Sequence, residues 1–242
     1  MKSLNQYIKE KLIINKDYHD NMIVVKSFDE LRKIIVDRYD KLGAGTKDNP
    51  IDFNDIDVSN LDSFCYNNAM HDRGIFEGTK FKYIDISDWD VSNVKSMRRM
   101  FFECKKLKSV RDLSNWDVSN VTDMNSMFWE CEKLELAGDL SNWDVSNVTN
   151  MGYMFAVCEN FNKDISKWDV SKVTDMSHIF YDCIYFNQNI SDLKVSKVTN
   201  MEGMFLNCKS FNQNISGWDV SKVTDMSYMF RYCRSFNQDI SK

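Results

Sequence analysis

The phrase SNWDVSNV stands at residues 114–121 and again at 141–148, 27 residues further along the chain. Its tryptophan belongs to a column formed by Trp89, Trp116, Trp143, Trp168 and Trp218, with Leu193 in the place of the missing member. Cysteines recur with the same period at Cys104, Cys131, Cys158, Cys183, Cys208 and Cys233. Self-similarity at a period of 25 to 27 residues indicates a repeat architecture.

The first half of a unit has the spacing of a strand. Ile165, Trp168 and Val170 follow the pattern LxxLxL, which is the strand portion of a leucine-rich repeat. Because side chains alternate along a strand, Trp168 and Val170 should point inward and Asp169 toward solvent. The pattern predicts one short parallel strand in every unit.

The second half of the unit has a longer spacing. Val173, Met176, Phe180 and Cys183 are separated by three, four and three residues, which is one face of a helix. The Thr-Asp pair at 174–175 suits a helix start, because both side chains satisfy free amides there. Each unit is therefore predicted to be a strand, a tight turn and a short helix or 3₁₀ segment, and such units must stack to bury their apolar faces.

An amphipathic helix is predicted before the first repeat. Ser27 and Glu30 have the spacing of a capping box. The helix should run from Phe28 to about Leu42 and end at Gly43. Its apolar face contains Leu31, Ile34, Ile35 and Tyr39.

These expectations define an α/β repeat fold, a right-handed leucine-rich-repeat-like solenoid of about 25–27 residues per unit with an N-terminal α-helical cap. Residues 1–50 are assigned to the cap, which should also contain an earlier helix starting at Ser3 and a strand within 22–25. Residues 51–242 are assigned to about seven solenoid units, the first of them degenerate. About seven extra residues are inserted between 64 and 78.

The motifs FNQDIS, WDVSNVTDM and MFxxC resemble the BspA-type leucine-rich-repeat family of bacterial surface proteins, first noted in mycoplasma lipoproteins. The resemblance extends over about residues 52 to 242. It implies an interaction scaffold, since family members are associated with adhesion and protein binding, and it brings no catalytic residue. Similar repeats occur in proteins encoded by phages of gut bacteria, so a phage protein is a further expectation.

The composition is that of a globular chain. The 242 residues are 43% hydrophobic and 28% charged, and the formal net charge of −5 gives no support for nucleic-acid binding. The start of the chain has neither a signal peptide nor a run long enough to cross a membrane. A cytoplasmic protein or a part of a phage assembly is therefore expected, and a cell-surface location only if a leader was removed.

No cofactor, metal site or enzyme is expected. The cysteine column should be a ladder of buried, reduced thiols, because the clustered spacing of a metal site, such as CxxC, is absent. No common nucleotide-binding, metalloprotease or hydrolase motif is present. Cys65 lies off the ladder near His71 and Asp72, where a nucleophile–base pair is conceivable and an irregular loop is the preferred interpretation.

The solvent-facing strand positions are the candidate binding site, because they line the concave sheet of a leucine-rich repeat. The aspartates have two candidate roles, a local bond to a neighbouring serine or the attraction of a basic partner or a divalent ion, and the local structural role is preferred. The candidate partner-binding residues are Asp90, Asp117, Asp144, Asp169, Lys172, Lys194, Lys197, Asp219 and Lys222.

The sequence thus predicts a non-enzymatic scaffold that binds an unknown protein partner through its concave sheet. The alternative is a structural or accessory protein that self-associates, or packs on a larger assembly, through an uncapped C-terminal unit. That alternative follows from the last residues, SFNQDISK, where a further strand would begin.

Overall fold

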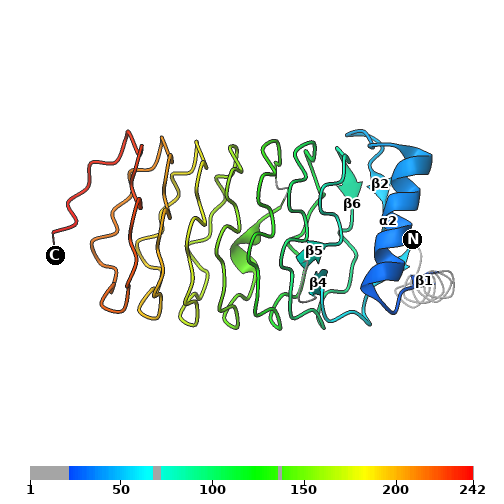
Figure 1. The fold of residues 1–242 in the computed structure, drawn as a ribbon, viewed down its shortest axis with the longest axis horizontal. Helices are drawn as coiled ribbons and strands as arrows, with labels where there is room; N and C mark the ends of the chain where they lie inside the picture. The colour runs from blue at the N-terminus through cyan, green and yellow to red at the C-terminus, as the bar shows by residue number, and fades with distance from the viewer. Residues whose placement is uncertain (1–21, 68–71, 136–137, 242) are drawn as a thin grey trace, which may run out of the picture.

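The computed structural model describes residues 22–67, 72–135 and 138–241. Coils of chain lie side by side from an N-terminal helix to the C-terminus (Figure 1). The elements in chain order are β1 (Ile23–Val24), α2 (Phe28–Leu42), β2 (Ile51–Asp52), β3 (Ile56–Asp57), β4 (Cys65–Asn67), β5 (Asp72–Gly74), β6 (Ile84–Asp85) and a 3₁₀ turn, η1 (Leu140–Asn142).

Helix α2 forms where the capping pattern predicts it. The Ser27 hydroxyl accepts from the Glu30 amide at 3.2 Å, and Gly43, at φ 75°, donates its amide to the Tyr39 carbonyl at 2.8 Å. Leu31 and Ile35 are fully buried against the first coils. The helix therefore covers the core at this end of the stack (Figure 1). The helix expected from Ser3 lies outside the described residues.

Short strands join the N-terminal region to the first coils. β1 pairs in parallel with β3, and β2 pairs in parallel with β6. The predicted strand within 22–25 is thus observed as β1. The insertion after Phe64 forms an antiparallel pair, β4 with β5.

The helix or 3₁₀ segment predicted in every repeat is absent, because among the described residues α2 is the only α-helix and the only 3₁₀ turn, η1, lies outside these segments. Each segment from the first methionine to the cysteine is instead a series of turns. Two residues per coil, four apart, have φ near 60°, such as Ser126 and Glu130. An α-helix cannot contain such left-handed residues. The spacing of the apolar residues correctly predicted which side chains are buried. The backbone conformation predicted for these residues was wrong.

These turns direct alternate amides toward the next coil. The N–H groups of Met124, Ser126, Phe128 and Glu130 donate to carbonyls of residues 150, 152, 154 and 156 at 2.9–3.0 Å. In an α-helix the same amides would donate to carbonyls of the helix itself. The stack therefore replaces hydrogen bonds within a helix by hydrogen bonds between coils.

The predicted strand at the tryptophan is also wrong. Trp168 and Val170 are buried and Asp169 is exposed, as alternation requires, but this segment forms no ladder. The parallel bridges of the repeats lie instead at the residue before the first methionine, in the column Ser96, Asp123, Asn150, Asp175, Asn200 and Asp225, and one further bridge joins Tyr83 to Ser109. The chain turns after the tryptophan because the aspartate caps a turn, as described below.

The core consists of side-chain columns that run along the stack. Each indole of the tryptophan column donates to a carbonyl of the preceding coil, as Trp143 does to Leu113 at 2.9 Å. Phenylalanine rings stack from coil to coil, and the centroids of Phe101 and Phe128 are 5.2 Å apart. These contacts hold every coil in register with its neighbours.

Candidate functional site

The five candidate aspartates are exposed, and each also caps a turn. The carboxylates of Asp90, Asp117 and Asp144 accept from the amides of the serines two residues further on at 3.0 Å. Asp169 and Asp219 make the same contact at 3.1 Å. This arrangement is the local bonding that aspartate and serine offer to a turn, and it accounts for aspartate in this column without any ligand.

The turn also affects the charge of these groups. Hydrogen bonds from the serine side chain and amide lower the pKa of Asp117, Asp169 and Asp219 below the ordinary value. The direction follows because both bonds favour the ionised carboxylate. These three side chains are therefore fully negative at neutral pH while one carboxylate oxygen remains in the turn.

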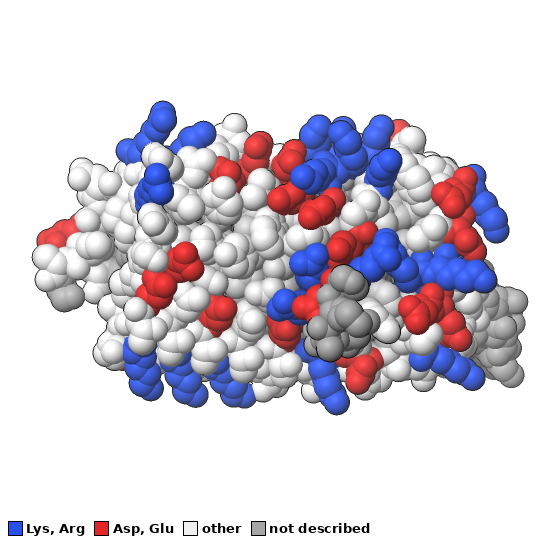
Figure 2. All heavy atoms as spheres, in the orientation of Figure 1, with Lys and Arg blue, Asp and Glu red and all other residues white. Residues whose placement is uncertain are grey.

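The neighbouring column changes from asparagine to lysine. Asn120 and Asn147 donate their side-chain amides to serine carbonyls of the preceding coil at 2.8 and 2.7 Å. Lys172 donates its ammonium to the Asn147 side-chain oxygen at 2.6 Å. Figure 2 shows regularly spaced basic side chains along one edge of the C-terminal coils. Three candidates, Lys194, Lys197 and Lys222, are exposed and make no hydrogen bond or ion pair with any described residue.

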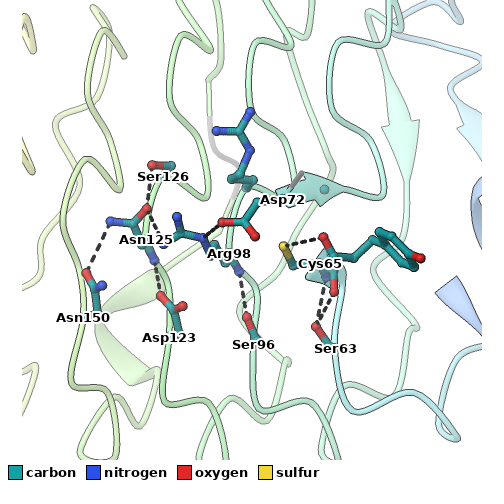
Figure 3. Close-up of polar contacts among 12 residues, drawn as sticks. Ser63, Cys65, Asp72, Ser96, Arg98, Asp123, Asn125, Ser126 and Asn150 are labelled. Carbon is teal, nitrogen blue, oxygen red and sulfur yellow. Dashed lines mark hydrogen bonds and ion pairs between the residues drawn. The ribbon is translucent and has the colours of Figure 1, made fainter. Parts of the chain in front are cut away.

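Cys65 lies in β4 at the edge of a polar network (Figure 3). Burial, and then the charge of Asp72, raise the pKa of the Cys65 thiol to about 11. Asp72 itself pairs with the Arg98 guanidinium at 2.9 Å, and Arg98 continues to the Asn125 side chain at 3.0 Å. His71 lies outside the described residues. The surroundings of Cys65 favour the protonated thiol, which is the opposite of what a nucleophile needs.

The cysteine column is a ladder of free thiols. Each donates to a phenylalanine carbonyl of the preceding coil, as Cys131 does to Phe101 at 3.1 Å. Burial raises the pKa of Cys131, Cys158, Cys183 and Cys208. Within the described ranges, no group of three or more His, Cys, Asp or Glu side chains could hold a metal ion.

A hollow that was not predicted from the sequence lies at the loops between cysteine and tryptophan. Its cavity has a volume of about 630 Å³, and four basic side chains line it, namely Lys47, Lys108, Arg111 and Lys133. The available signals were the two extra residues in the longer units and the run KKLK at 105–108. Neither signal predicts that Lys47 lies at the same hollow, because its position depends on how the N-terminal cap packs on the coils.

Columns of identical contacts at a period of 25 to 27 residues define a repeat protein of stacked coils. The chain belongs to the family described as "Mycoplasma protein of unknown function, DUF285", whose model matches residues 49–156 and 133–242. No curated protein and no solved structure matches the chain. In the part of the chain that the structure describes, no helix is long and apolar enough to cross a membrane.

Thiol reactivity tests the environment of the cysteines. The pKa of both Cys65 and Cys233 is raised to about 11, so native modification by a thiolate-specific reagent should accelerate about tenfold per pH unit and level only near pH 11. The other five thiols should react only after unfolding. The variant Cys233→Ser isolates the signal of Cys65, and fast reaction of Cys65 at pH 7 would contradict this environment.

Proposed function

We propose that this protein is a non-enzymatic scaffold that binds another protein through the exposed aspartate and lysine columns. The observation that carries the proposal is the display of these side chains at a fixed period on coils locked together by hydrogen bonds. We further propose that the stack is a right-handed leucine-rich-repeat-like solenoid of the BspA type, with the columns on its concave side.

The order of charged residues along the two columns favours a partner with a matching order of charges. The first half of the aspartate column is uninterrupted, at Asp90, Asp117 and Asp144, whereas lysines enter the two columns from Lys172 onward. A partner with a basic region opposite the early coils and an acidic region opposite the late coils would match this order. Such complementarity favours rapid encounter and correct register.

The absence of an activated nucleophile at Cys65 supports a binding role over catalysis. Burial raises the pKa of its thiol, and its carbonyl and amide are bonded to Ser63 rather than directed at a pocket. The rival enzyme with Cys65 and His71 therefore has no support from the environment of the thiol.

Two triple variants separate the binding role of the aspartates from their role in the turns. Asp90→Asn, Asp117→Asn and Asp144→Asn together keep an oxygen that caps each turn but remove the charge. We expect this variant to retain the unfolding midpoint and to lose capture of the native partner in a pull-down. Exchanging the same residues for alanine should instead lower stability by about 1 kcal/mol per lost hydrogen bond.

Unchanged capture by the asparagine variant would show that the binding site does not include this column. A lowered unfolding midpoint in that variant would show that the charge is needed for the turn itself. The matched control is Asp112→Asn, which changes an aspartate in another turn column and should leave capture intact.

A second candidate function rests on the last coil. Val220, Met226, Tyr228 and Ile240 are 38–56% exposed, and the amides of residues 226, 228, 230 and 232 have no acceptor among the described residues. Apolar surface beside unpaired amides is a template for association. We propose, as the alternative, a structural or accessory role in which this end packs on a second copy or on a larger assembly, such as that of a phage.

Light scattering tests this alternative. The chain should form dimers or larger species at about tens of micromolar, a concentration suited to a modest interface. Val220→Lys with Ile240→Lys should return it to a monomer, whereas Val36→Lys, at an exposed position of α2, should not. A monomeric parent protein would exclude self-association through the last coil.

A further inference from the structure

The basic hollow is separate from the aspartate and lysine columns. It lies where the loop after α2 meets the coils that carry the two extra residues, and besides its basic side chains it includes Tyr83, Ser109 and Glu135. Figure 2 shows lysine and arginine side chains gathered along the edge over β6 and the adjacent coils. We call this feature the basic groove.

Hydrogen bonds between successive loops build the floor of the basic groove. The Lys82 amide donates to Ala44 at 2.7 Å, the Lys108 amide to Lys82 at 2.7 Å, and the Glu135 amide to Lys108 at 2.9 Å. The cap loop and three coils therefore contribute to one continuous floor. The groove is a preformed feature of the packed chain.

The charges in the groove are only partly compensated. Lys47 and Lys133 make no ion pair with any described residue, and the Lys108 ammonium lies 6.0 Å from the centre of the Tyr83 ring. Arg111 approaches Asp85 only to 3.7 Å, and its guanidinium also donates to the Lys47 carbonyl at 3.4 Å. Since the whole chain has a net charge of −5, this gathering of cations is a local property.

Arg111 occupies a backbone position that suits glycine. Its φ is 61°, and the residue at the same place in the next unit, five before the tryptophan, is Gly138 with φ 81°. Left-handed backbone is costly for residues with a Cβ. An arginine at this position is therefore less stable than a glycine would be.

We propose that the basic groove binds a small organic polyanion with two or more phosphate or sulfate groups. The Arg111 guanidinium offers paired donors to one acid group, and the three lysines supply positive charge to the others. A cavity of about 630 Å³ is in the size range of small-molecule sites. Glu135 is the one carboxylate in the lining and weakens the binding of any anion.

Calorimetry with inositol hexakisphosphate and inositol hexasulfate tests the proposal. We expect saturable binding of one ligand per chain, weakened by added salt, and the preferred probe identifies the acid group. Lys108→Gln and Arg111→Gly should each reduce affinity about tenfold. Glu135→Gln should raise it severalfold, and Lys197→Gln, outside the groove, should leave it unchanged.

Arg111→Gly also separates binding from folding. Relief of the left-handed strain should raise the midpoint of thermal unfolding by about 2–4 °C while affinity falls. A variant that is more stable yet binds less tightly cannot be explained by misfolding. The absence of saturable binding, full affinity in Arg111→Gly, or an equal loss in Lys197→Gln would each overturn the proposal.

Discussion

The hydrogen bonds between coils are the interaction on which this structure depends. In each coil from Met97 to Asn207, four alternate amides between the first methionine and the cysteine donate to carbonyls of the following coil. The peptide groups that make these bonds point the same way along the stack. This direction requires left-handed residues at every second bonded position, such as Tyr153 and Val157, and the strain of those residues is offset by the bonds that they permit.

Side chains bond in the opposite direction and fix the period of the repeat. Tryptophan indoles, threonine hydroxyls and cysteine thiols donate back to the preceding coil, as Trp168, Thr174 and Cys183 do at 2.8, 3.2 and 3.1 Å. An insertion within these segments would break several columns at once. The two extra residues of the longer units fall in the loop between cysteine and tryptophan, where they leave those columns intact, and these longer loops contribute residues to the lining of the basic groove.

Much of this arrangement could be predicted from the sequence, because burial follows directly from the repeat. The buried columns, the helix at 28–42 and the outward position of Asp169 were predicted from spacing and capping. The series of turns in each repeat was not predicted, because it buries Val173, Met176 and Phe180 with the same spacing as a helix would. Left-handed tyrosine, valine or histidine has no sequence signal, since these residues do not favour that conformation. The basic groove was missed because Lys47 and Lys133 are brought together only by tertiary packing.

Amide hydrogen exchange, resolved by residue, tests the central claim most directly. Residues 201, 203, 205 and 207 donate to the last coil, whereas the equivalent residues 226, 228, 230 and 232 have no following coil among the described residues. We expect slow exchange for the first set and fast exchange for the second. Equal protection of both sets would contradict that claim, because amides bonded within helices would be protected in the last coil as well.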